Sequence, residues 1–244
     1  MTSVGLVVAL PGEKRTLTKA RIQPGHFTRL NGNTLIVLSG IGPDRAAEGA
    51  AILIRQGCNA LLSWGCSAAL KPDLKPGDLI IPEKVLCANG ETIHTDHEWR
   101  GKLLERLFDR QTIHSGPITE SRTLVGTAVE KQTLRNQTGA IALDMESAAI
   151  ARLAARQNLP FVAIRAIADP ATMDLPKPVA IAANQNADPG LALLLPLITR
   201  YPGSIPALVR LGICFRAAQR GLRLTAAILE YDFYPNPAYA QTSF

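Results

Sequence analysis

The sequence lacks the features that mark secreted or membrane-spanning proteins. No apolar stretch approaches the roughly 20 residues that a transmembrane helix needs. The N-terminus has no basic segment followed by a long apolar run, so no signal peptide is predicted. No two cysteines have CxxC spacing, and we expect all of them to be reduced and mostly buried. They are Cys58, Cys66, Cys87 and Cys214. These absences lead us to expect a cytoplasmic protein.

Several common binding and catalytic motifs are also missing. There is no GxSxG, no Walker pattern and no Rossmann GxGxxG. His94 and His97 stand three residues apart, but no third ligand stands at metal spacing, so HTDHEW is predicted to be a polar loop without metal. No nucleic-acid motif with interleaved aromatic residues occurs, so we expect no nucleic-acid partner. We expect no cofactor.

The 244 residues, 47% hydrophobic and 19% charged, are enough for one globular α/β domain with a large core. Apolar runs typical of buried strands alternate with helical patterns. The predicted strands are 4–10, 33–40, 59–65, 77–88 and 161–169, and the clearest helices are 43–57 and 144–158. This alternation predicts a mixed, mainly parallel sheet flanked by helices on both faces.

The formal net charge of +6 is unevenly distributed. Residues 209–228 carry four arginines and no acid. We favour a terminal helix packed on the domain with a solvated arginine face. The alternative is a basic amphipathic helix that rests on an anionic membrane surface. We therefore divide the chain into an α/β domain, residues 1–205, and a basic C-terminal helix and tail, residues 206–244.

Glu146 occupies an unusual place. It precedes Ala149, Ile150 and Leu153 by three, four and seven residues, so it shares the apolar face of the predicted helix. An unpaired buried carboxylate costs several kcal/mol, so Glu146 needs a partner or a ligand. Alternatively it is an acid at the helix start, favoured by the helix dipole. Asp144 could already cap this helix.

Further polar and small residues follow the predicted strands, where open α/β sheets bind ligands. Gly12, Glu13 and Arg15 follow the first strand. SGIG follows the second predicted strand and could cradle an anion. A turn with Ser67 follows the third strand, and Asp169 ends the last one. Each has a plainer interpretation: a glycine turn for SGIG, solvated loop charges for Glu13 and Arg15, and an Asx turn for Asp169. Their convergence nevertheless predicts a site at one edge of the sheet.

Five segments carry a resemblance to a known family over residues 4 to about 172. They are VVALPGE, LSGIGPDRAA, SWGCSAALKPDLKPGDLIIP, LDMESAAIARLAA and FVAIRAIAD. In this order they resemble the nucleoside phosphorylase and nucleosidase superfamily, especially the methylthioadenosine/S-adenosylhomocysteine nucleosidases. LDMESAAIARLAARQNLPF followed by AIADPATMDLPKP is similar to the hopanoid-biosynthesis branch, which acts on adenosylhopane. The resemblance implies a nucleoside phosphorylase-like catalytic domain and a homodimer or larger oligomer.

The resemblance also implies roles for particular residues. Glu146 would accept hydrogen bonds from the ribose hydroxyls, with Met145 against the sugar. Asp169 would protonate purine N7, and Glu13 would orient a water. Thr123 and Leu124 would line the base site, where nucleosidases have an aromatic residue. If phosphate attacks instead of water, its region would comprise Gly12, Arg15, Gly42, Arg45, Cys66 and Ser67.

The resemblance favours adenosylhopane as the substrate, cleaved to adenine and ribosylhopane, or to phosphoribosylhopane if phosphate is a co-substrate. A lipid-linked substrate would suit a basic C-terminal helix that touches the inner membrane from the cytoplasm. One alternative is a methylthioadenosine/S-adenosylhomocysteine nucleosidase, a hydrolase. The other is a nucleoside-binding protein without activity, which the joint presence of Glu13, Glu146 and Asp169 disfavours.

Overall fold

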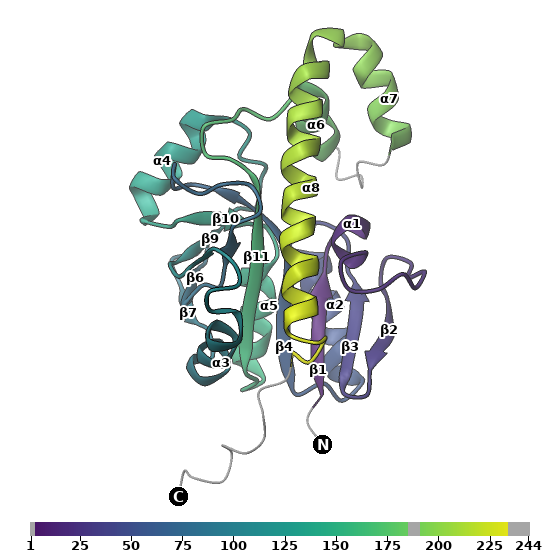
Figure 1. Cartoon of the computed structure of the whole chain (residues 1–244), viewed down its shortest axis with the longest axis vertical. Coiled ribbons are helices and arrows are strands. Elements are labelled where there is room, and N and C mark those ends of the chain that lie inside the picture. The colour runs from purple at the N-terminus through teal and green to yellow at the C-terminus, as the bar shows by residue number, and fades with distance from the viewer. Residues whose placement is uncertain (1–2, 185–190, 234–244) are drawn as a thin grey trace, which may run out of the picture.

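The computed structural model describes residues 3–184 and 191–233, and its centre is one mixed β-sheet flanked by helices (Figure 1). The strands are β1 (Val4–Val8), β2 (His26–Asn31), β3 (Thr34–Leu38), β4 (Ala60–Ala69), β5 (Leu79–Ile80), β6 (Lys84–Leu86), β7 (Thr92–His94), β8 (Ile113–His114), β9 (Ile118–Glu120), β10 (Ala142–Asp144) and β11 (Phe161–Asp169). The helices are α1 (Pro11–Lys14), α2 (Pro43–Arg55), α3 (His97–Leu107), α4 (Ala128–Thr138), α5 (Ser147–Arg156), α6 (Lys177–Asn184), α7 (Leu191–Arg200) and α8 (Ile205–Ile228), with a short 3-10 turn (Pro202–Ser204) before α8.

The strands form one sheet in the order β2-β3-β1-β4-β10-β9-β6-β7, with β11 paired to β4 and β5, and β8 paired to β5. Of the ten strand pairs in the described residues, six are parallel and four antiparallel. The mixed, mainly parallel sheet predicted from the sequence is therefore confirmed. Strand β4 is central, because it pairs with β1, β10 and β11.

Two apolar cores lie on opposite faces of the sheet. Helices α2 and α5 cover one face, where Leu53 and Ile150 pack with the inward side chains of the strands. Helices α3 and α8 cover the other, where Trp99 and Leu222 pack around Trp64. Because both faces are covered, β1 and β11 are continuously buried, as their unbroken apolar runs predict.

Apart from small shifts at the ends of other elements, three of the sequence predictions need correction. The strand predicted at 77–88 is divided into β5 and β6, with Pro82 between them, because proline cannot donate to a sheet ladder. HTDHEW is not a polar loop. It joins the end of β7 to the start of α3, where the Asp96 carboxylate accepts from the Trp99 N–H at 2.8 Å and caps the helix. Helix α5 begins at Ser147, so Glu146 immediately precedes the helix.

Helix α8 packs on the sheet, as the favoured interpretation of the basic segment predicts. One of its faces is buried; the buried residues are Cys214, Ala218, Leu222, Thr225 and Ala226. Its four arginines are exposed; they are Arg210, Arg216, Arg220 and Arg223. No helix in residues 3–184 and 191–233 has the length and apolarity needed to cross a membrane. The last part of the predicted tail, 234–244, lies outside the described residues.

Candidate active site

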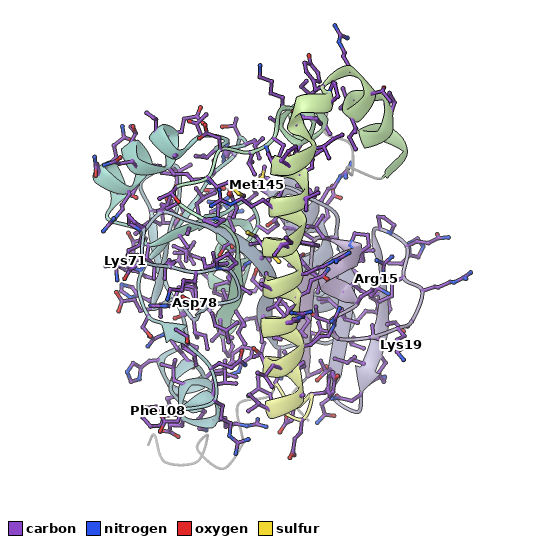
Figure 2. The ribbon with its side chains drawn as sticks, turned by 45° about the horizontal axis from the view of Figure 1, so that its top comes forward. Arg15, Lys19, Lys71, Asp78, Phe108 and Met145 are labelled. Carbon is purple, nitrogen blue, oxygen red and sulfur yellow. The ribbon has the colours of Figure 1, made fainter. Side chains whose placement is uncertain are left out.

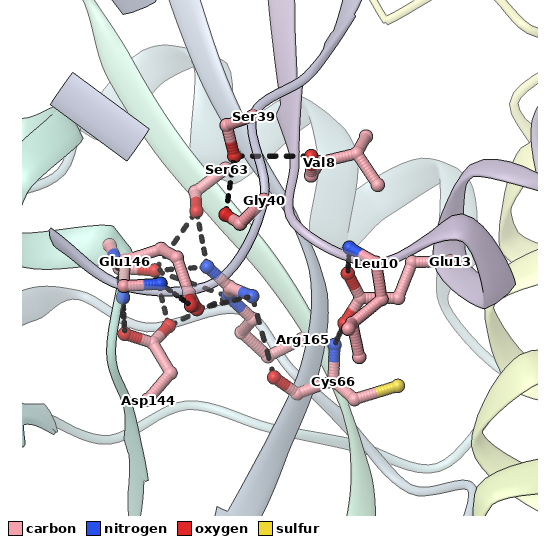
Figure 3. A network of polar contacts seen from close by, with 12 residues as sticks. Val8, Leu10, Glu13, Ser39, Gly40, Ser63, Cys66, Asp144, Glu146 and Arg165 are labelled. Carbon is pink, nitrogen blue, oxygen red and sulfur yellow. Dashed lines mark hydrogen bonds and ion pairs between the residues drawn. The ribbon is translucent and has the colours of Figure 1, made fainter. Parts of the chain in front are cut away.

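A buried arginine on β11 organises the candidate site (Figure 3). The Arg165 side chain is 1% exposed, and its Nε lies 2.7 Å from Asp144 Oδ2 at the end of β10. Its Nη2 donates to the Ser63 and Ser147 hydroxyls. A third contact, 3.8 Å long, joins Arg165 to Glu146 Oε2. We did not predict Arg165 from the sequence, although a charge inside an apolar strand signals a buried partner.

Glu13 reaches the same cluster from β1 through the short helix α1. It is 2% exposed. Its Oε1 accepts from the Cys66 N–H at 2.7 Å, and its Oε2 accepts from the Leu10 N–H at 2.9 Å. A Cβ added to Gly65 would lie 2.6 Å from both Glu13 Oε1 and an Arg165 nitrogen, so the glycine makes room for this pair. Burial raises the pKa of Glu13, and the Arg165 charge opposes that rise.

Glu146 lies between the N-terminal ends of helices α2 and α5. Its Oε1 accepts from the Gly42 N–H at 3.1 Å, just before α2. It makes no cap hydrogen bond at the α5 start. Asp144 does so instead, because its Oδ1 accepts from the N–H groups of Glu146 and Ser147. Burial raises the pKa of Glu146 to about 7, against the lowering effect of Arg165. The role of helix-start acid therefore belongs to Asp144.

Asp169 ends β11 just after an irregularity in the strand register between residues 167 and 169. Irregularities of this kind re-aim side chains near functional sites. Its Oδ1 accepts from Lys131 Nζ on α4 at 2.7 Å. Within the described residues it makes no hydrogen bond to its own loop backbone, so the Asx-turn interpretation is not supported. Burial raises the pKa of Asp169 to about 6, although Lys131 lowers it. Lys131 has no evident signal in the sequence.

Three residues of the predicted nucleophile region lie on α1 and β4: Gly12 is in α1, while Cys66 and Ser67 are inside β4, which continues to Ala69, so the turn predicted at Ser67 is wrong. A Cβ on Gly12 would lie 2.6 Å from Gln219 Nε2, so α8 covers α1 closely. The Cys66 backbone binds both Glu13, through its N–H, and Arg165, through its carbonyl at 3.4 Å. The buried Ser67 hydroxyl has no hydrogen-bond partner within the described residues. An unpaired buried hydroxyl at this position is suited to contact a ligand.

The two arginines predicted for phosphate lie differently. The Arg45 side chain folds over Gly40. A Cβ added to that glycine would lie 3.0 Å from Arg45 Cδ. Arg45 thus lies beside the loop that presents Gly42 to Glu146. Arg15 is exposed, on the opposite side of α8 from Met145 in Figure 2. The structure therefore brings Glu13 into the buried cluster and leaves Arg15 outside it.

The predicted sugar and base contacts occupy the remaining edges. Met145 is half-buried between β10 and α5, directly beside Glu146. Thr123 is exposed and Leu124 half-buried, in the loop between β9 and α4. The backbone of this loop is joined to the segment after β11, because the Leu175 N–H donates to the Gly126 carbonyl at 2.7 Å. The loop and the Asp169 segment are thus neighbours.

Together these residues define an α/β protein whose sheet edge gathers buried carboxylates, one arginine and an unpaired hydroxyl. Such a set can bind a polyhydroxylated ligand through Glu146 and transfer a proton through a carboxyl of raised pKa. A model of the phosphorylase superfamily matches residues 3–193, and the chain belongs to that superfamily.

Individual relatives agree with this assignment. The chain is 26% identical over 196 residues to a 5′-methylthioadenosine/S-adenosylhomocysteine nucleosidase of Maridesulfovibrio salexigens, covering 68% of this chain and 85% of the relative. The structure of the corresponding Neisseria meningitidis enzyme in complex with methylthio-immucillin-A has a TM-score of 0.70 and 19% identity, covering 95% of this chain and 100% of that one. Futalosine hydrolase of Helicobacter pylori has a TM-score of 0.66 and 17% identity, covering 93% and 97%.

The expected family, fold and enzyme class are confirmed by these matches. The family is a family of enzymes, so the alternative of a nucleoside-binding protein without activity is not supported. The hopanoid-biosynthesis branch is not shown by them, and the curated relative agrees better with the nucleosidase alternative.

Proposed function

We propose that the protein hydrolyses the N-glycosidic bond of a 5′-substituted adenine nucleoside, with methylthioadenosine as the first substrate to test. The observation that carries this proposal is the joint placement of Glu13 and Glu146 around Arg165. The activity of the Maridesulfovibrio salexigens relative supports it. In this proposal Glu146 binds the ribose diol, and Met145 packs against the sugar. Thr123 and Leu124 lie at the base.

The proposed chemistry uses one proton donor and one base. Asp169 donates its proton to purine N7 as the bond between C1′ and N9 breaks, so the purine leaves neutral. The sugar passes through an oxocarbenium-like state, which the nearby carboxylates stabilise. A water forms the new bond to C1′ and gives its proton to Glu13. The raised pKa of Asp169 favours the protonated form that this step requires.

Charge favours water over phosphate as the nucleophile. Asp144, Glu146 and Glu13 surround a single guanidinium, and Arg165 is already paired with Asp144. A phosphate dianion would lie beside these carboxyl groups, whose ionised forms repel it, and would find no unpaired cation among them. Of the two arginines predicted to attract phosphate, Arg15 is exposed and outside the cluster, and Arg45 folds over Gly40. These facts support hydrolysis and argue against phosphorolysis.

Adenine release, followed by chromatography, tests the proposal. Methylthioadenosine is supplied with and without phosphate, and adenosylhopane in detergent is assayed alongside. Adenine from methylthioadenosine at a rate independent of phosphate is the expected result. Strict dependence on phosphate would contradict the hydrolytic step and return Gly12, Gly42, Arg45, Cys66 and Ser67 to a phosphate site.

A lipid-linked nucleoside remains a second candidate because of one observation on α8. Ile205, Val209 and Ile213 are four residues apart on one helix face and are 47%, 58% and 61% exposed. No acidic residue occurs in 189–229, whereas five arginines do. An apolar stripe within a basic segment suits contact with an anionic membrane surface. In that case adenosylhopane would be the better substrate of the two.

Binding to vesicles tests this membrane contact in the full chain. We expect sedimentation with vesicles that contain phosphatidylglycerol, and less with pure phosphatidylcholine. Val209→Glu should weaken binding, whereas Leu224→Glu, an exposed apolar position near the other end of α8, serves as the matched control. Equal binding of all three proteins would exclude the stripe as the contact.

We also propose that the protein is cytoplasmic and forms a homodimer or a larger oligomer. Light scattering would measure the molar mass of the oligomer in solution.

A further inference from the structure

Lys131 is the most completely enclosed cation close to the candidate site. It lies on α4 with an exposed fraction of 0%. Its Nζ donates to Asp169 Oδ1 at 2.7 Å, to the Pro170 carbonyl at 2.9 Å and to the Met173 carbonyl at 2.8 Å. An ammonium group has three N–H donors, so these acceptors use all of them. The charge is therefore compensated within the fold, and it is available to no other ligand.

This arrangement restrains one side of the Asp169 carboxylate. Oδ1 is held by Lys131, while Oδ2 has no hydrogen-bond partner among the described residues. The Asp169 side chain is still 12% exposed, whereas Lys131 is not exposed at all. The carboxylate can therefore meet a ligand only through its free side. A proton donor held in one orientation reaches a fixed acceptor atom more readily than one that rotates.

Lys131 also joins two segments that are distant in the sequence. Its bonds to 169–173 connect α4 to the segment after β11. Two further bonds reinforce the connection: the Ala128 N–H donates to Asp174 Oδ1 at 2.8 Å, and the Leu175 N–H donates to the Gly126 carbonyl. The loop that carries Thr123 and Leu124 leads directly into α4. The proton donor and the predicted base loop are thus anchored to one common helix.

Three charged or titratable groups face Asp169 from different elements. Lys131 approaches from α4 and lowers the pKa of Asp169, and Asp174 in the following loop raises it. Cys214 approaches from α8 as a buried thiol whose own pKa is raised. Lys131 is the one group of the three that favours the ionised carboxylate. Loss of its charge would leave burial and Asp174 to favour the protonated form.

We propose that Lys131 is a positioning residue for the proton donor: it holds one oxygen of Asp169, presents the other to the purine, and sets the pH above which the donor loses its proton. The inference rests on the proposed function, because it assumes that Asp169 donates to the base. A merely structural ion pair between α4 and β11 would share the geometry, but its loss would leave the pH profile unchanged.

The test is the pH profile of kcat/KM for adenine release by the wild type and four variants. Lys131→Met and Lys131→Gln remove the charge, and Gln keeps a hydrogen-bond donor. Lys131→Arg keeps the charge. Arg135→Met, one turn further along α4, is the matched control. Activity should fall as Asp169 ionises, so removing the cation should move this alkaline limb upward by about 1 pH unit or more. We expect kcat to fall about tenfold or more, with a smaller change in KM.

Lys131→Arg should return the alkaline limb towards its wild-type position, and Arg135→Met should leave it unchanged. An unmoved limb in both neutral variants would overturn the proposal and identify a structural pair. If Lys131→Met does not fold, Lys131→Gln decides. A wild type that releases no adenine would refute the proposed function instead. In that case, NMR titration of the Asp169 carboxyl carbon, assigned with Asp169→Asn, still tests whether Lys131 lowers its pKa.

Discussion

Arg165 lies 2.7 Å from Asp144 but 3.8 Å from Glu146, so the buried guanidinium is paired mainly with the residue that caps α5. Glu146 is left with one backbone donor, Gly42, and a distant cation. A buried carboxylate so weakly compensated has unused acceptor capacity. This explains how an acid can face an apolar helix surface: Asp144 stabilises the helix end, and Glu146 remains available to a ligand.

Glu146→Gln should weaken nucleoside binding. Under the proposed function, the carboxylate accepts from both ribose hydroxyls, and a neutral amide offers one acceptor oxygen. Hydrogen bonds to charged groups contribute about 1.5–3 kcal/mol, so kcat/KM for adenine release should fall roughly 10- to 100-fold. Glu48→Gln, an exposed position on α2, is the matched control and should keep wild-type kinetics. Unchanged kinetics in Glu146→Gln would remove this residue from the ribose site.

Asp169→Asn should separate binding from turnover. The amide has the shape of the acid but cannot supply the proton that the proposed function sends to N7, and general acid catalysis typically contributes about 10²- to 10⁴-fold. We expect kcat to fall within that range, while calorimetry still detects nucleoside binding. Asp73→Asn changes an exposed aspartate and should leave kcat unaltered. Full activity in Asp169→Asn would show that another group protonates the purine.

The sequence predicted the sheet well where burial is continuous. The apolar run at 161–169 matches β11 to the residue, because both faces of that strand are covered. The run at 77–88 was less informative, since its apolar residues support two short strands on either side of Pro82. A proline within an apolar run is a visible signal, and it should have divided this prediction.

The site was predictable only in part, because its interactions are tertiary. Glu13, Glu146 and Asp169 could be proposed from strand ends and resemblance. Lys131 could not, since α4 is a polar helix on which a lysine normally faces solvent. Its partner is 38 residues away in the sequence. Arg165 was detectable in principle, as the charged residue inside an apolar strand, but its partners became evident only when β10 and α5 were placed beside it.

The stability difference between the wild type and Glu146→Gln should depend on pH. Burial raises the pKa of Glu146 from 4.5 to about 7, so the folded protein binds this proton more tightly than the unfolded chain. The resulting contribution to stability is complete below pH 4.5 and is lost as the pH rises through about 7. Glutamine resembles the protonated acid at every pH. Relative to the variant, the wild type should therefore lose roughly 1–3 kcal/mol between pH 4.5 and 8.

Urea unfolding of both proteins across that pH range measures this difference. The comparison cancels the effect of carboxylates common to both chains. Glu120 is one of them: Arg152 lowers its pKa, so its contribution to stability is lost as the pH falls rather than as it rises. If the difference in unfolding free energy is constant from pH 4.5 to 8, the pKa of Glu146 is not raised by folding. If the wild type gains stability over the variant as the pH rises, folding lowers the pKa of Glu146 instead.

Gly65→Ala tests whether the close approach of Glu13 and Arg165 matters for activity. The added methyl carbon would lie 2.6 Å from an oxygen of one and a nitrogen of the other, too close for any real Cβ. One of the two side chains must therefore move, at a cost of about 1–3 kcal/mol in unfolding free energy. We expect kcat/KM to fall as well, because under the proposed function Glu13 would lose its position beside C1′. Gly101→Ala is the control: its Cβ meets nothing within 4 Å, and alanine is favoured in a helix. Normal activity in a destabilised Gly65→Ala protein would show that the contact serves folding alone, and the water-activating role would then have to be sought in another carboxylate of the cluster.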